Sequence, residues 1–167
     1  MSEINVRPLA FHITFGTYGT RLHGDERGTI DRKANRPGDP IVGSDASWWS
    51  QERGRMKFPP VVLTLEQMRH AEQSVPYVCT RGEWTLRTCA AGPDHVHVLL
   101  TAMCLHPEPE RIRMWLKRWL GQAMSKRWSL PEGATWWAEG GCIRYVWSEE
   151  YYEAVHKYER DQRAAPP

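Results

Sequence analysis

Residues 84–100 have the sequence WTLRTCAAGPDHVHVLL, in which a Gly-Pro-Asp turn separates two stretches of apolar character. The alternation from Trp84 to Ala90 and the apolar run from Val96 to Leu100 are both typical of β-strands. A turn of this composition between two strands predicts an antiparallel hairpin. Because side chains alternate across a strand, His95 and His97 should project from the same face of the second strand.

Residues 10–17, AFHITFGT, also alternate between apolar and polar side chains and predict a further strand. A short strand is predicted over residues 143–147. Between the first strand and the hairpin, Thr64 to Gln67 fit a capping box, which predicts the start of a helix. We expect this helix to continue to about Val75 and to end at Pro76.

Two more helices are predicted in the second half of the chain. One runs from Pro107 to about Trp128 on helically spaced apolar residues, and the other begins after Ser148, which is a favourable N-cap. The predicted order is strand, helix, strand, strand, helix, strand, helix. The first six elements match the split βαβ order. We therefore predict an α+β fold: a ferredoxin-like (RRM-like) antiparallel sheet with helices packed on it, plus a C-terminal helix.

The composition indicates one ordinary globular domain over residues 1–167, with a long loop insertion at about 19–60 that lacks sustained periodicity. The four cysteines are widely spaced, and we interpret them as reduced thiols. No stretch is as long as a membrane span and no secretory signal is evident. We therefore expect a cytoplasmic protein without membrane contact. The net charge of +2 says little about nucleic acid.

The histidine pair is a candidate metal site, because neutral imidazoles on a rigid strand are natural ligands. The alternatives are two polar residues on a solvated face or two hydrogen-bonded core residues. A hard divalent cation also needs an oxygen ligand. We expect Asp94 mainly to form the turn; the alternative is that it orients an imidazole or approaches the metal. His12 is expected at the surface, the alternative being that its position on a strand brings it to the site.

In the last helix, Tyr151, Val155, Tyr158 and Gln162 have the spacing of one helix face, which should pack toward the sheet. The amide oxygen of Gln162 would be the third metal ligand. An ordinary amphipathic helix with a solvated glutamine is the alternative. Of the three tyrosines, Tyr158 is preferred as the reactive one because only it is followed by glutamine four residues later.

A tyrosine and a bound cation together suggest attack on a phosphodiester. A phenol, with a pKa of about 10, is a poor nucleophile at neutral pH. A cation beside the phosphate polarises it and balances charge during in-line displacement. The tyrosine would then be joined to the 5′ side of the break and leave a free 3′ hydroxyl, so the strand can be rejoined without ATP.

The sequence resembles the single-tyrosine HUH endonucleases, which include insertion-sequence transposases and REP-associated tyrosine transposases. His95-Val96-His97 matches their His-hydrophobic-His motif, and residues 158–162, YERDQ, match their Tyr-x-x-x-Gln motif. Residues 11–15, 18–20 and 24–28 resemble the opening of the REP-associated members. The resemblance implies a ferredoxin-like sheet, Mg²⁺ or Mn²⁺, and cleavage of single-stranded DNA near a hairpin or palindromic repeat. Both monomers and homodimers occur among such proteins.

The predicted function is thus a metal-dependent single-stranded DNA endonuclease and strand transferase, a transposase or a domesticated relative. DNA contacts are expected from the basic side chains of the second helix, although a solvated helix face is the alternative; they are Arg111, Arg113, Lys117, Arg118, Lys126 and Arg127. The rival functions are a non-catalytic module that binds single-stranded DNA or RNA hairpins and a metal-dependent hydrolase that uses activated water.

Overall fold

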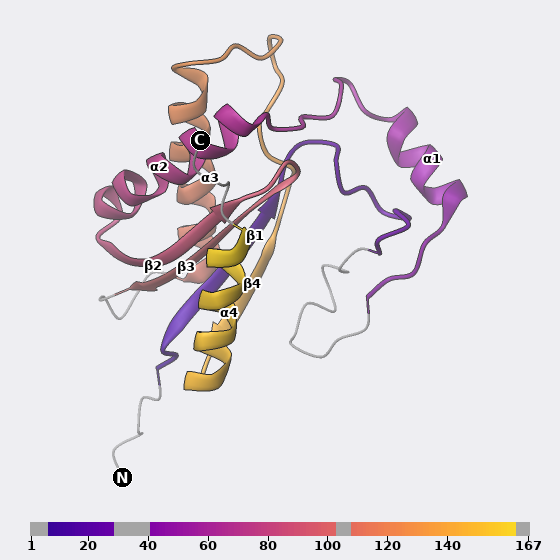
Figure 1. Ribbon diagram of the computed structural model, residues 1–167. Coiled ribbons are helices and arrows are strands. Elements are labelled where there is room, and N and C mark those ends of the chain that lie inside the picture. Colours follow the sequence, from indigo (N-terminus) through magenta and orange to yellow (C-terminus); the bar gives the residue numbers. More distant parts are fainter. Residues whose placement is uncertain (1–6, 29–40, 103–107, 163–167) are drawn as a thin grey trace.

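The computed structural model describes residues 7–28, 41–102 and 108–162. In these ranges a four-stranded antiparallel sheet is flanked by helices (Figure 1). The elements, in chain order, are β1 (Ala10–Gly16), α1 (Ala46–Gly54), α2 (Leu65–Arg81), β2 (Trp84–Ala91), β3 (His95–Ala102), α3 (Pro109–Ser125), β4 (Cys142–Val146) and α4 (Glu149–Gln162).

The strand order β2-β3-β1-β4 confirms the predicted ferredoxin-like topology. β2 and β3 form the expected antiparallel hairpin, with Ala91 opposite Val96. β1 lies in the centre of the sheet and pairs with β3 on one side and with β4 on the other. The register places Thr14 of β1 opposite His97 of β3, and Gly16 opposite His95. The histidine motif is therefore at the start of one of the two central strands.

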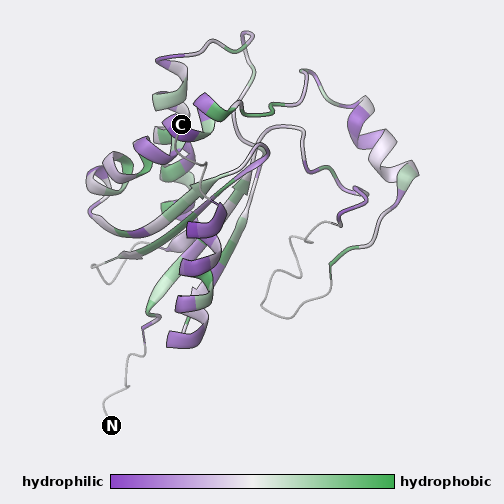
Figure 2. Ribbon diagram, viewed as in Figure 1, coloured by the Kyte–Doolittle hydropathy of each residue, from purple (hydrophilic) through white to green (hydrophobic). Residues whose placement is uncertain are grey.

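The two faces of the sheet have different partners. One face, which includes Ile13 and Val98, packs against α2 and α3 in the main hydrophobic core, where Ile112 and Leu116 of α3 are fully buried. The other face carries α4 and a smaller apolar cluster of Ala10, Leu99, Val146 and Val155. Figure 1 shows α4 on the side of the sheet opposite α3. The strands are largely hydrophobic, whereas α4 is mostly hydrophilic along its length (Figure 2).

Helix α2 begins as predicted but continues beyond Pro76. The capping box is formed, with Thr64 and Gln67 each accepting from the other's backbone N–H. Pro76 has no N–H to donate to the carbonyl of Glu72, one turn earlier. The thiol of Cys89 in β2 lies 3.7 Å from that carbonyl oxygen and donates to it. The prediction that Pro76 ends the helix was therefore wrong, because packing against β2 supplies a donor in place of the missing one.

The segment expected to be a long loop contains α1. Asp45 caps this helix by accepting from the backbone N–H of Trp48. None of its residues is buried, and this explains why no apolar periodicity predicted it. The other helix boundaries differ slightly from expectation: α3 starts at Pro109 and ends at Ser125, and the predicted start at Pro107 lies outside the described residues.

In the ranges that the structure describes, no helix has the length and apolar character needed to cross a membrane.

Candidate metal and nucleophile site

His95 and His97 project from the same face of β3, and this is the face that carries α4. Their ring centroids are 4.6 Å apart and the ring planes are nearly perpendicular. His97 is buried and His95 is half-buried. Gly92, in the turn before β3, lies under the His95 ring, where an added Cβ would come within 2.9 Å of its Cε1 atom. The hairpin therefore holds the two imidazoles close together and restricts the position of the first.

Asp94 fixes the orientation of His95. The Nδ1–H of His95 donates to Oδ1 of Asp94 at 2.5 Å, which leaves Nε2 of the ring as the free nitrogen. The other carboxylate oxygen of Asp94 accepts from Arg27, at 2.7 Å, and faces Arg21, at 3.4 Å. Burial alone raises the pKa of Asp94, but His95, Arg21 and Arg27 together hold it below its ordinary value. Asp94 was expected mainly to form the turn, and it also orients an imidazole.

His97 is held by β1. Its Nδ1 atom lies 2.8 Å from the hydroxyl oxygen of Thr14 and 3.3 Å from Nε2 of His12. In the tautomer with the proton on Nδ1, His97 donates to Thr14 and its Nε2 lone pair is available. The rings of His12 and His97 are also stacked, with centroids 5.4 Å apart. His12 was expected at the surface, but its side chain is only 12% exposed and forms part of the site.

Burial favours the neutral form of both His97 and His12. Burial, together with the nearby His95, His12 and Arg21, lowers the pKa of His97 to about 3. Burial and the charge of Arg144 lower the pKa of His12 to about 4. A neutral imidazole is the form that binds a metal ion, so His97 needs to lose no proton in order to act as a ligand.

Helix α4 brings Tyr158 to the histidines. The tyrosine ring meets the ring of His97 edge-on, with centroids 5.6 Å apart, and its side chain is 49% exposed. The next residue, Glu159, is fully buried, and its Oε1 atom lies 3.4 Å from Nε2 of His12. The buried residues of α4 are Val155 and Glu159. The face of α4 that packs on the sheet therefore differs slightly from the prediction: Glu159 is buried in it, whereas Tyr158 lies at its exposed edge.

The residues fit a divalent cation in the chemistry of their donor atoms. His95 and His97 each contact the protein through Nδ1, and their Nε2 atoms are left to bind a metal ion. Among the described residues, no group of three or more His, Cys, Asp or Glu side chains is arranged to hold a metal ion. The predicted third ligand, the amide of Gln162, would be of another type. Gln162 is the last residue of α4 and is exposed.

The predicted DNA-binding residues, on α3 and immediately after it, lie across the sheet from the histidines, because α3 packs on the opposite face. Several of them have other contacts. Lys117 donates to the carbonyls of Ala138 and Gly140, and Arg113 donates to that of Gly141. The guanidinium of Arg118 lies over Trp115, and Arg127 pairs with Glu66. Arg111 and Lys126 are exposed. The structure does not bring this set to the histidine site.

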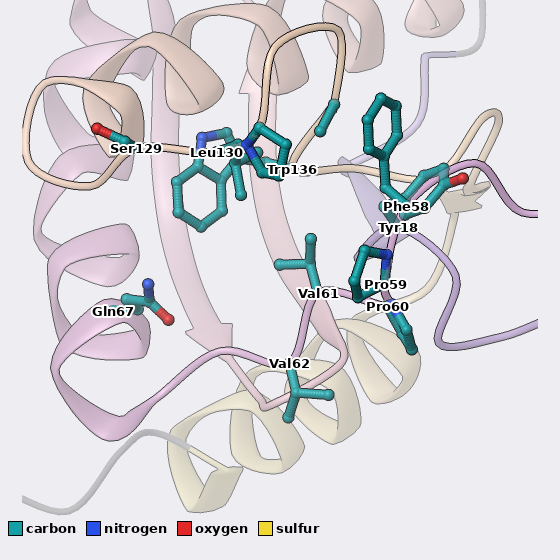
Figure 3. A pocket seen from close by; sticks show the side chains of 12 residues that line it. Tyr18, Phe58, Pro59, Pro60, Val61, Val62, Gln67, Ser129, Leu130 and Trp136 are labelled. Carbon is teal, nitrogen blue, oxygen red and sulfur yellow. The ribbon is translucent and has the colours of Figure 1, made fainter.

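A separate apolar hollow of about 240 Å³ lies between residues 58–62 and residues 129–136. Tyr18 and Phe58 lie together at one end, next to Pro59 and Pro60 (Figure 3). The backbone N–H of Leu63, next to the lining residue Val62, donates to the carbonyl of Pro93 and so joins the 58–63 segment to the β2-β3 hairpin. The described lining has no carboxylate, imidazole or cationic side chain. The histidine face, by contrast, holds the groups that are capable of metal or proton chemistry.

Sequence reasoning missed Glu159 and favoured a surface position for His12. His12 and Glu159 are 147 positions apart in the chain and meet only because α4 packs on the sheet face that carries His12. The alternation of β1 does carry a usable signal, since His12 and Thr14 point away from the core residues Ile13 and Phe15. No comparable signal marks Glu159, which resembles any other charged residue of a hydrophilic helix.

The sheet order and the histidine face define an α+β protein of ferredoxin-like topology with a tyrosine helix over a histidine pair. No protein-family model and no curated protein matches the sequence.

The fold resembles those of two solved structures. One is a putative transposase from Deinococcus radiodurans R1, with 18% identity, a TM-score of 0.49, and coverage of 99% of this chain and 98% of that one. The other is a REP-associated tyrosine transposase bound to a REP hairpin, with 12% identity, a TM-score of 0.48, and coverage of 95% of this chain and 70% of that one. At identities and TM-scores this low, the similarity concerns only the course of the backbone. Neither structure supports a conclusion about activity.

Proposed function

We propose that this protein is a metal-dependent endonuclease and strand transferase that acts on single-stranded DNA through a phosphotyrosine intermediate. The role would be that of a transposase or a domesticated relative. The observation that carries the proposal is the contact of Tyr158 with His97, at a centroid distance of 5.6 Å. Tyr158 and His97 are 61 positions apart in sequence, and their contact supports a site shared by the two motifs.

The directions of α4 and β3 support the assignment of Gln162. Val155 packs with Leu99, and Tyr158 meets His97, so α4 runs antiparallel to β3. The next turn of α4 carries Gln162, and the next residue on the same face of β3 is His95. A helical turn advances by about 5.4 Å and two strand residues by about 6.6 Å, so the two elements stay roughly in step.

In the proposed step, the hydroxyl oxygen of Tyr158 attacks the phosphorus of a phosphodiester. The bond from phosphorus to the 3′ oxygen breaks, and a 5′-phosphotyrosine ester forms. The phenol gives up its proton and the departing 3′ oxygen ends as a hydroxyl. The half-exposed side chain of Tyr158 is accessible to a strand lying across this face, while the buried Val155 and Glu159 anchor the helix on either side.

His95 and His97, with the amide oxygen of Gln162, would hold Mg²⁺ or Mn²⁺. Bound there, the ion would polarise the phosphate oxygens and balance the charge that develops during displacement. The protein contributes the orientation of the ligands. Asp94 and Thr14 fix the two rings through Nδ1, which reduces the rearrangement needed on binding.

The test is covalent capture of DNA. The protein is incubated with Mn²⁺ and a pool of single-stranded hairpin oligonucleotides labelled at the 3′ end, and adducts are resolved on a denaturing gel. We expect an adduct from the unaltered protein and none from Tyr158→Phe, with DNA binding largely retained. Tyr152→Phe is the matched control, because Tyr152 lies on the same helix but packs against the small apolar cluster.

The rival functions give different results. Binding of hairpins without any adduct would indicate a non-catalytic nucleic-acid-binding module. Metal-dependent cleavage that persists in Tyr158→Phe would indicate a hydrolase using activated water. An adduct formed by Tyr158→Phe would reject Tyr158 as the nucleophile.

A further inference from the structure

Two arginines reach the histidine site from the segment that follows β1. Thr20 anchors this segment, since its hydroxyl donates to the carbonyl of Thr17 at 3.0 Å and lies 3.3 Å from the carbonyl oxygen of Asp94. The backbone N–H of Thr17 also donates to the backbone carbonyl of Asp94. The side chains of Arg21 and Arg27 therefore start from backbone that is tied to the turn before His95.

Arg27 has a structural function. Its Nε and NH2 groups donate to the two carboxylate oxygens of Asp25, each at 2.9 Å. A second bond from NH2 reaches the carbonyl of Thr20, and NH1 donates to Asp94, both at 2.7 Å. Four of the five N–H donors of this guanidinium are thus in use. Arg27 holds Asp94 in place, and through it His95.

Arg21 differs from Arg27 in the use of its donors. Its Nε atom lies 3.4 Å from Oδ2 of Asp94, and its side chain is 46% exposed. In the described part of the chain, no other hydrogen bond engages its guanidinium. Arg21 therefore places an accessible cation with unused donors at the edge of the histidine pair.

We propose that Arg21 binds a phosphate of the DNA strand at the histidine site through its terminal amino groups. A guanidinium offers parallel donors that match the oxygens of a phosphate, and it remains charged at any working pH. The contact with Asp94 would keep Nε directed toward the hairpin while the NH1 and NH2 groups meet the substrate. The basic residues of α3 cannot take this role at the same face, because the sheet separates them from it. This inference rests on the proposed function, since it uses the same substrate and the same site.

The salt dependence of binding gives a direct test. Fluorescence anisotropy with a labelled single-stranded hairpin, in Mn²⁺ and over a series of salt concentrations, yields the slope of log K against log salt. Each phosphate contact contributes about 0.7 to 0.9 to the magnitude of that slope. We expect Arg21→Gln to weaken binding and to lower the magnitude of the slope by the amount of about one phosphate contact. Arg21→Lys should restore the slope.

Arg55→Gln is the matched control. Arg55 is 74% exposed and pairs with Glu52 one turn earlier, at the end of α1, so its loss should leave the slope unchanged. Mn²⁺ affinity is measured for each variant in the absence of DNA. A purely structural role of Arg21, acting through Asp94, would change Mn²⁺ affinity and leave the slope as it is; that result would overturn the inference.

The outcomes separate this inference from the proposed function. Salt-dependent binding that requires Arg21, without any covalent adduct, would support the phosphate contact and reject the strand transferase. An adduct formed with an unchanged slope in Arg21→Gln would support the transferase and reject the contact. Absence of all binding to single-stranded hairpins would reject both.

Discussion

The rings of Tyr158 and His97 meet edge-on with their centroids 5.6 Å apart, although 61 positions separate the two residues in the chain. β3 carries the histidine through the centre of the sheet, and α4 carries the tyrosine across the face that α2 and α3 leave uncovered. The proposed chemistry depends on this contact. It also depends on the residues that hold the histidines and the helix in position, among them Asp94, His12 and Glu159. Each of these gives a separate prediction.

Replacement of Asp94 by asparagine should weaken metal binding. The amide cannot accept from Nδ1–H of His95 as strongly as a carboxylate does, and loss of such partners typically lowers metal affinity by about 10-fold to 100-fold. Titration of Mn²⁺ by calorimetry measures the change. Asp45→Asn is the control, because asparagine caps a helix as well as aspartate does. Equal Mn²⁺ affinity in Asp94→Asn and the unaltered protein would contradict the role given to Asp94.

Truncation of Glu159 should loosen the tyrosine helix. Glu159→Ala removes a fully buried side chain next to His12 and leaves a cavity. We expect the free energy of unfolding to fall by about 2–4 kcal/mol, measured by urea denaturation. Adduct formation should fall with it, since α4 positions Tyr158. Glu153→Ala, at an exposed position of the same helix, should change stability by less than about 0.5 kcal/mol. Similar losses in the two variants would argue against a specific role for Glu159.

Acid should destabilise the metal-free protein through its buried imidazoles. Burial lowers the pKa of His97 from 6.5 to about 3 and that of His12 to about 4. Between pH 6.5 and these values the unfolded chain binds protons that the folded chain does not. The contribution of the neutral rings is therefore complete above pH 6.5 and is lost as the pH falls toward the folded-state values.

Urea unfolding in the presence of a chelator, from about pH 7.5 down to about pH 5, measures this effect. We expect the stability of the unaltered protein to fall over this range, and that of His12→Gln to fall less steeply, because glutamine cannot take up a proton. Parallel pH dependences for the two proteins would show that His12 does not contribute.

Removal of the amino group of Lys117 should affect stability and not DNA binding. Its amino group donates to the carbonyls of Ala138 and Gly140, and burial lowers its pKa to about 8. Lys117→Met should lower the free energy of unfolding by about 1–3 kcal/mol, whereas Lys126→Met, at an exposed position, should not. The slope of log K against log salt for hairpin binding should stay unchanged in Lys117→Met. A shallower slope would indicate that α3 contacts the DNA after all.

Much of the fold could be predicted from local patterns. The alternation of residues 10–17, the turn of the hairpin and the capping box at Thr64 each depend on neighbouring residues, and all of them are present in the structure. Two elements were not predicted correctly. Pro76 lies inside α2 because a thiol from β2 replaces a missing donor, and α1 forms without any buried face.

The sequence by itself determined that two imidazoles share one face of a strand and that a tyrosine lies on the last helix, because these properties follow from the periods of strand and helix. Only the tertiary structure decided which side chains surround them. Strand register brings Thr14 and His12 to His97, the crossing of α4 buries Glu159 beside them, and the sheet separates the cations of α3 from the site. Such contacts depend on pairing between distant segments, which no local pattern encodes.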